Sequence, residues 1–260
     1  MNREAYAPLL RLGLADPPMA VKFDYFQPAA LPPLEADAHL SLCEMLRESQ
    51  RSRRPFYFCD RNDETCVGKI FLGMQEMEPF AQSGQIGQRL GVFQEARANA
   101  QLYRHIWKMD RGSVNYVSFW PVENGSEPPF DPDVLVVSAK PSQAEVLLRA
   151  AGYHDGVVYT SQSTPVMGCT WFLIYPFRSG NINYVLPALI HGPHGRQLYP
   201  EDTVLVSIPY QWIPTVLENL AQMPIHLKGH ESREAYYAEF GGILQDLAAE
   251  KAAEDARQQN

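Results

Sequence analysis

The sequence has no apolar run that approaches the roughly 20 residues a helix needs to cross a bilayer. Its longest candidate, Cys169 to Pro176, is far shorter. Charged residues such as Arg3, Glu4 and Arg11 interrupt the first 20 positions, so no export signal is expected. The chain is therefore predicted to be cytoplasmic, without membrane contact, and its cysteines are expected to stay reduced.

Basic residues are also scarce, because 22 Lys and Arg stand against 30 Asp and Glu and give a formal net charge of −8. A nucleic-acid partner needs clustered Lys and Arg for phosphate contacts, so none is expected. The one basic cluster, between Arg47 and Arg54, is typical of a solvated helix end and turn. No phosphate-binding loop, serine nucleophile elbow or His-Glu-x-x-His zinc helix is present.

The remaining composition is that of a globular protein, with 45% hydrophobic and 20% charged residues. The length of 260 residues suits one large domain or two modest ones. We expect a single domain over residues 1–252, with 1–112 and 113–230 as alternative halves. The Ala/Glu/Gln-rich residues 253–260 are expected to form a frayed tail.

Periodicity predicts a mixture of strands and helices. Strands are expected at 19–23 and 56–58, where apolar residues alternate or form short runs. Apolar residues at three- and four-residue spacing predict helices over 35–50, 86–109 and about 232–252.

A weak internal repeat appears in the second half. Val134-Leu135-Val136 and Val204-Leu205-Val206 are identical at an offset of 70 residues, and each precedes a proline-marked helical stretch. The repeat indicates a duplicated strand–helix unit. The predicted fold class is therefore α+β, a mixed sheet with packed helices and an internal duplication of strand–helix units.

Four cysteines are the residues best suited to chemistry, because a thiolate is both a soft metal ligand and a nucleophile. They are Cys43, Cys59, Cys66 and Cys169. Cys43 is predicted on the apolar face of a helix, Cys59 at the end of a strand, and Cys169 in the first turn of a helix.

Glycines accompany two of these cysteines. Gly68 follows Cys66 closely and Gly168 precedes Cys169, so both glycines are candidate cofactor-binding positions where backbone amides approach a sulfur or an anion. Cys59 and Cys66 are separated by six residues, unlike the gaps of about two to four in zinc ribbons and ferredoxins. Any site must therefore be assembled by folding.

Three interpretations of the cysteines stay open. They are small buried hydrophobes, ligands of a metal ion or an iron–sulfur cluster, or a reactive thiol at Cys169. The reactive thiol would need a nearby base, for which His154, His191 and His194 are candidates.

Several of these stretches, in this order, resemble a prokaryotic family of uncharacterised proteins, DUF169 (ArCR). The matching segments are 12–23, the helix with Cys43, the strand 56–58 leading to Cys66 and Leu72-Gly73, the segment 131–144, Cys169, and the strand 204–209. Where family members commonly have a glycine pair, Val67-Gly68-Lys69 keeps one glycine. The resemblance implies an α+β domain with repeated cysteines and supplies no reaction.

The functional hypothesis is a cytoplasmic redox or accessory protein that binds a metal. Cys43, Cys66 and Cys169 are expected to converge on an iron–sulfur cluster or zinc, with Cys59 as an optional fourth ligand. A small-molecule ligand or a redox protein would be the partner, and a homodimer is the expectation from base rates. The alternative is a non-enzymatic module whose aromatic-lined cleft binds a small ligand or a partner protein and whose cysteines are structural.

Overall fold

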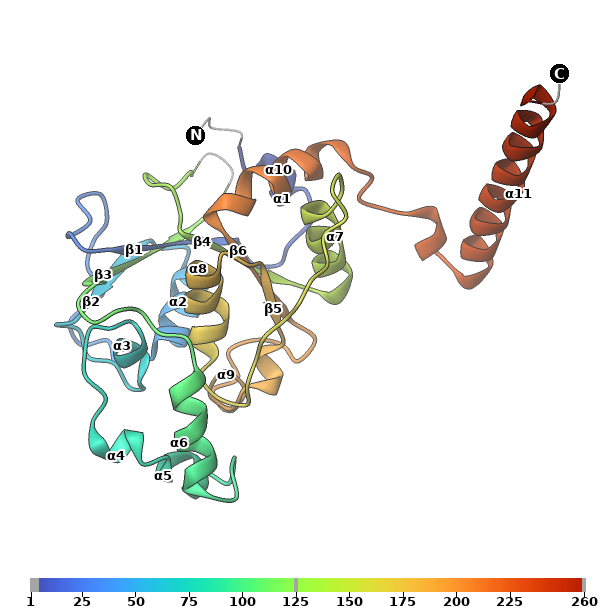
Figure 1. Cartoon of the computed structure of the whole chain (residues 1–260). Helices are drawn as coiled ribbons and strands as arrows, with labels where there is room; N and C mark the ends of the chain where they lie inside the picture. The colour runs from blue at the N-terminus through green and yellow to red at the C-terminus, as the bar shows by residue number, and fades with distance from the viewer. Residues whose placement is uncertain (1–4, 124–125, 259–260) are drawn as a thin grey trace. The chain divides into compact units, whose positions relative to one another are not determined.

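Short apolar runs form the six strands of one sheet (Figure 1). The strands are β1 (Met19–Asp24), β2 (Phe56–Cys59), β3 (Tyr116–Pro121), β4 (Val134–Ala139), β5 (Asn183–Val185) and β6 (Val204–Pro209). Their spatial order is β2-β3-β1-β4-β6-β5, and every neighbouring pair is antiparallel. The α+β class is confirmed. The sheet was expected to be mixed, but in the described chain only isolated bridges, such as Pro33 with Tyr57, are parallel.

This computed structural model describes residues 5–123 and 126–258. Its α-helices are α1 (Ala7–Leu10), α2 (Leu42–Ser52), α3 (Gly68–Phe71), α4 (Pro79–Gln82), α5 (Gln85–Arg89), α6 (Ala96–His105), α7 (Pro141–Ala151), α8 (Tyr175–Ser179), α9 (His191–Gly195), α10 (Ile213–Gln222) and α11 (Arg233–Gln258). A π-helical segment, η1 (Thr170–Ile174), leads directly into α8, and the 3₁₀ segments are η2 (Pro187–Leu189), η3 (Tyr210–Trp212) and η4 (Lys228–His230).

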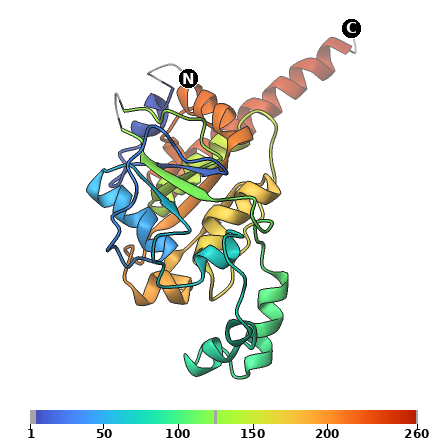
Figure 2. The same ribbon diagram turned by 90° about the vertical axis from the view of Figure 1, so that its left-hand side faces the viewer.

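The alternation of side chains along each strand separates two faces of the sheet. On β4, Val134 and Val136 belong to the main core, which also contains residues of α2 and η1. Leu135 and Val137 are buried on the other face, where α7 packs against β4 and β6. Figure 1 shows α2 and α8 below the sheet and α1 and α10 above it, and Figure 2 shows the α4–α6 segment projecting from this body.

The repeated sequence forms equivalent elements. Val134–Val136 lies in β4 and Val204–Val206 in β6, and these two strands pair with each other. β4 is followed by α7 and β6 by α10, with Pro141 and Pro214 in the first turn of each helix. Asn219 of α10 donates a hydrogen bond to the backbone carbonyl oxygen of Ala150 in α7 (2.7 Å), which joins the two copies.

The predicted helix over 86–109 is wrong in its extent. The chain forms α5, a turn and then α6, because Gly91 adopts a left-handed backbone conformation (φ 73°) that ends the first helix. Leu90 and Trp107, two of the apolar residues whose spacing predicted that helix, are exposed.

The contacts divide the chain into two compact units, Met1–Ala221 and Gln222–Asn260. The second contains η4 and α11, and α11 continues to Gln258, past the residue 252 where a frayed tail was expected. Within the described ranges, no helix combines the length and apolar character needed to cross a membrane.

Ser41 defines the start of α2, which carries Cys43 in its first turn. The Ser41 hydroxyl accepts a hydrogen bond from the Glu44 amide, and the Glu44 carboxylate accepts one from the Ser41 amide (2.8 Å), completing a capping box. The helix therefore begins at Leu42 and not near residue 35.

We expect Ser41→Ala to lower the free energy of unfolding by about 1 kcal/mol, because the cap of α2 is lost. Urea unfolding followed by tryptophan fluorescence measures this, since all four tryptophans lie in the first unit. The matched control is Ser52→Ala, at the exposed end of the same helix, which should change stability by less than about 0.5 kcal/mol. Equal effects of the two changes would contradict the capping role.

Candidate functional site

Cys43 and Cys169 each lie in the first turn of a helix, and both are buried in the main core. Cys43 is the second residue of α2. The helical turn that begins at Gly168 and Cys169 continues as η1 and α8, as the sequence predicted for this helix start. Both thiols thus lie at the positive end of a helix, where a negative charge is stabilised. The π-helical segment that follows Cys169 is a rare form that is frequent at functional sites.

Cys66 lies in a loop, close enough for its charge and those of the other two thiols to influence one another. It lies two positions before α3, and it is exposed, unlike the other three cysteines. Three segments that are remote in the sequence therefore supply the three cysteines, which we call the thiol cluster (Cys43, Cys66 and Cys169).

Glu64 holds this loop against the start of α2. Its carboxylate accepts hydrogen bonds from the backbone amides of Gly68 (2.9 Å) and Leu42 (3.4 Å). Burial is the largest influence on Glu64 and raises the pKa of its carboxyl group, although these amides act in the opposite direction. Sequence reasoning missed Glu64, because its partner Leu42 lies 22 residues away and the local sequence does not show that the two meet.

Burial and the neighbouring thiols together raise the pKa of Cys66 and of Cys169. The hydrogen bond with Cys43, followed by burial and the charges of Cys43 and Cys66, raises the pKa of Cys169 well above its ordinary value. Desolvation, followed by the charges of Cys43 and Glu64, raises the pKa of Cys66 to about 11. Cys66 is exposed on one side, yet enough protein surrounds its sulfur to make desolvation the leading cause. Cys66 and Cys169 are therefore neutral thiols at pH 7.

Arg196, whose charge acts on Cys66, is already paired with an acid. Arg196 lowers the pKa of Cys66 slightly, and its Nε lies 3.3 Å from a carboxylate oxygen of Glu44. Across residues 5–123 and 126–258, no three His, Cys, Asp or Glu side chains form a group that could hold a metal ion as they stand.

A family described as DUF169, uncharacterised ArCR, matches residues 10–219. The chain belongs to this family. The match includes all four cysteines and ends before α11. No curated protein and no solved structure matches the chain.

Cys59 of this DUF169 protein lies apart from the thiol cluster. Phe58 points into the main core, so its neighbour Cys59 points to the other face of the sheet, where it packs with Leu31 and Tyr57. Its backbone amide donates to the Asn62 side-chain oxygen (3.0 Å), and its thiol lies 3.4 Å from the same atom. The structure therefore does not bring the optional fourth ligand to the other three.

The two candidate glycines are positions of close packing. A Cβ atom on Gly68 would lie 2.9 Å from the Cβ atom of Leu42, and one on Gly168 would lie 2.9 Å from Cγ of Pro193. Gly68 thus lets the Cys66 loop approach α2, and Gly168 lets the helix with Cys169 approach α9. Both glycines position a cysteine, and their contact with a cofactor stays a prediction.

The histidines considered as bases for Cys169 make other contacts. His194 Nδ1 lies 2.6 Å from the backbone oxygen of Ala188, and the ring of His154 packs against Tyr153. Over the part of the chain that is described, no hydrogen bond joins a histidine ring to a thiol. The arrangement therefore lacks the thiol–base pair of a cysteine nucleophile.

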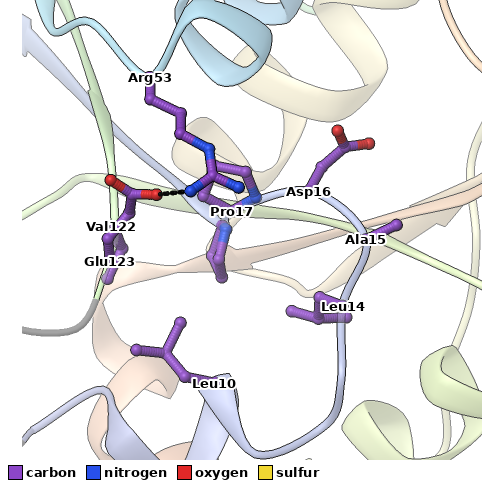
Figure 3. A pocket seen from close by; sticks show the side chains of 9 residues that line it. Leu10, Leu14, Ala15, Asp16, Pro17, Arg53, Val122 and Glu123 are labelled. Atoms are coloured by element: carbon purple, nitrogen blue, oxygen red, sulfur yellow. Dashed lines mark hydrogen bonds and ion pairs between the residues drawn. The ribbon is translucent and has the colours of Figure 1, made fainter.

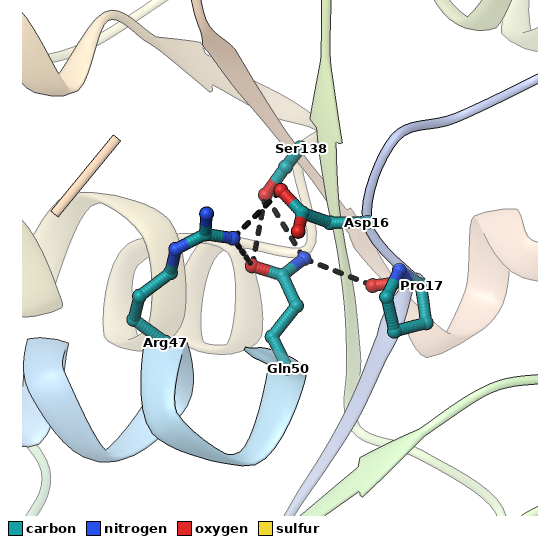
Figure 4. A network of polar contacts seen from close by, with 5 residues as sticks. All are labelled: Asp16, Pro17, Arg47, Gln50 and Ser138. Atoms are coloured by element: carbon teal, nitrogen blue, oxygen red, sulfur yellow. Dashed lines mark hydrogen bonds and ion pairs between the residues drawn. The ribbon is translucent and has the colours of Figure 1, made fainter. Parts of the chain in front are cut away.

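One turn beyond Cys43, α2 contributes to a buried polar network (Figure 4). Arg47 pairs with Asp16 (2.6 Å) and donates to Gln50 (2.8 Å), and Gln50 donates to Ser138 Oγ of β4 (3.0 Å). The Arg47 guanidinium also lies 4.8 Å from the ring centre of Tyr199. This network fixes α2, and with it Cys43, against the sheet and the segment before β1.

The hollow drawn in Figure 3 lies beside residues 14–18, which precede β1, and has a volume of about 220 Å³. Its lining combines Leu10 and Leu14 with the ion pair of Arg53 and Glu123 (2.7 Å). No cysteine and no aromatic side chain lines it. It does not match the aromatic cleft of the alternative hypothesis.

We expect Cys66 of chelator-treated, reduced protein to react with iodoacetamide about 100-fold more slowly at pH 7 than an ordinary thiol with a pKa near 9. Only the thiolate reacts, so the rate should rise about tenfold per pH unit up to a midpoint near pH 11. Peptide mass spectrometry over a pH series measures the rate at each cysteine.

The other three cysteines serve as internal controls and should stay unmodified in the folded protein, because they are buried. A reactivity midpoint for Cys66 at or below pH 9 would contradict the raised pKa.

Proposed function

We propose that this DUF169 protein is a cytoplasmic redox or accessory protein that binds a metal ion or an iron–sulfur cluster through Cys43, Cys66 and Cys169. The observation that carries the proposal is the convergence of three thiols from three remote segments at two helix starts.

The electrostatics of the thiol cluster favours a cation. Each thiolate raises the energy of its neighbours, so Cys66 and Cys169 stay protonated when nothing positive is present. A metal reverses this preference, because thiolates are its ligands and their negative charges are then compensated. The helix starts at Cys43 and Cys169 add to the stabilisation of negative charge.

Three thiolates suit two kinds of group. A zinc ion with three cysteine ligands, or a cubane iron–sulfur cluster with three of its irons bound by the protein, leaves one position open. Cys43 and Cys169 would supply buried ligands. Cys66 is the exposed member, and the proposal requires its loop to turn toward the other two thiols on binding. The open position would then face solvent, where a small molecule or a redox protein can approach.

The deciding experiment is anaerobic purification followed by a visible absorption spectrum and assays for iron, zinc and sulfide. We expect stoichiometric metal in the wild-type protein and in Cys59→Ser, and its loss in Cys66→Ser. Cys66 is the informative position, because it is exposed and its change to serine leaves the core intact. Thermal unfolding of both variants checks that each is folded.

Metal-free, colourless protein from this preparation would refute the proposal and leave the alternative, a module that binds a ligand or a partner protein and whose cysteines are structural. Equal metal loss in Cys59→Ser and Cys66→Ser would refute the choice of ligands.

Titration of the chelator-treated protein with zinc at pH 7 should release protons, at least one each from Cys66 and Cys169 per ion bound, because both are neutral thiols before binding. A pH indicator in weakly buffered solution measures the release. Affinity should increase with pH, because proton loss accompanies binding. Binding without proton release, or with affinity independent of pH between 6 and 8, would contradict the role of these thiols.

A further inference from the structure

α11 exposes a continuous apolar face. None of its 26 residues is buried, and its large apolar side chains are between 48% and 58% exposed. These side chains are Tyr236, Tyr237, Phe240, Ile243, Leu244 and Leu247. The family match ends at residue 219, so this face is an addition to the DUF169 body and does not belong to its core.

The spacing on this face is that of a coiled-coil seam. Tyr236, Phe240, Ile243 and Leu247 follow one another at intervals of four, three and four residues. Such intervals place side chains on one stripe that packs against a second helix. Tyr237 and Leu244 widen the stripe on one side.

The helix also needs a partner for its own stability. Gly241 and Gly242 lie in its interior, and each glycine costs about 1 kcal/mol relative to alanine there. Most helical stability in proteins comes from packing of the apolar face. A helix with two interior glycines and no buried residue is therefore incomplete as it stands.

The charges of α11 identify the kind of partner. The helix carries six acidic residues against three basic ones, which disfavours an anionic membrane surface or a nucleic acid. Arg233 lies three residues before Tyr236, and Glu250 lies three residues after Leu247, so both continue the seam at its ends. Over the described residues, neither forms an ion pair within its own chain.

An antiparallel second copy gives every residue of this seam a suitable partner in a single register. The register that sets Phe240 against Ile243 of the second copy also sets Tyr236 against Leu247 and Arg233 against Glu250. A parallel register would instead set Arg233 against Arg233 and Glu250 against Glu250, and like charges opposite one another are unfavourable.

We infer that α11 is a self-association element through which two copies of this chain form an antiparallel helix pair. The inference is independent of the thiol cluster and of the proposed metal. The pair should form and dissociate with concentration, because each copy contributes only one short apolar stripe.

Sedimentation equilibrium of the full-length, reduced protein over a range of concentrations tests the inference. Wild-type protein should show a monomer–dimer equilibrium, and Phe240→Glu with Leu247→Glu should be monomeric throughout. The control Gln245→Glu adds a charge on the opposite side of the helix and should dimerise as the wild type does. Tryptophan fluorescence, which reports on the first unit, verifies that the body of each variant is folded.

Charge reversal tests the orientation. Arg233→Glu alone and Glu250→Arg alone should each weaken self-association by roughly tenfold or more, because each sets like charges against one another at both ends of the seam. An equimolar mixture of the two variants should associate as well as the wild type does.

Three outcomes would overturn the inference. They are a wild-type chain that is monomeric at every concentration, a dimer unaffected by Phe240→Glu with Leu247→Glu, and single charge reversals without effect. The second would place the interface on another surface, and the third would exclude the antiparallel register.

Discussion

The part-buried carboxylate of Glu64 makes the interaction on which the thiol cluster depends. It accepts hydrogen bonds from the amides of Leu42, at the start of α2, and of Gly68, at the start of α3. These hydrogen bonds offset only part of the cost of burying the carboxylate, because its pKa is still raised. These bonds fasten the loop with Cys66 to the helix with Cys43. Gly68 permits the approach, since a side chain there would collide with Leu42.

Two opposing influences then act on the thiols. The helix starts at Cys43 and Cys169 favour negative charge by up to about 1 kcal/mol each. Burial and the neighbouring sulfurs oppose it, and they prevail, because the pKa values of Cys66 and Cys169 are raised. Cys66 and Cys169 are therefore neutral thiols beside helix starts that favour negative charge. That combination distinguishes them from Cys59, which occupies an ordinary apolar contact on the other face of the sheet.

Local patterns predicted the elements well and the site in part. Alternation and short apolar runs located β1 and β2, and the repeat located β4 with α7 and β6 with α10. The same alternation indicates that Cys59 faces away from Phe58. The sequence alone could therefore have predicted that Cys59 lies apart from the other cysteines. The helix over 86–109 failed because the left-handed turn at Gly91 outweighed its apolar spacing. The role of Glu64 lay beyond local reasoning, since it depends on contact between segments 22 residues apart.

The central claim is that folding brings the sulfurs of Cys43, Cys66 and Cys169 together and leaves Cys59 elsewhere. A crystal structure of protein purified and crystallised without oxygen would give the distances between the sulfur atoms directly. The account predicts three sulfurs within about 4–7 Å of one another, the range set by metal–sulfur bonds near 2.3 Å, around a metal or cluster. Sulfurs dispersed through separate packed regions, with no metal between them, would contradict it.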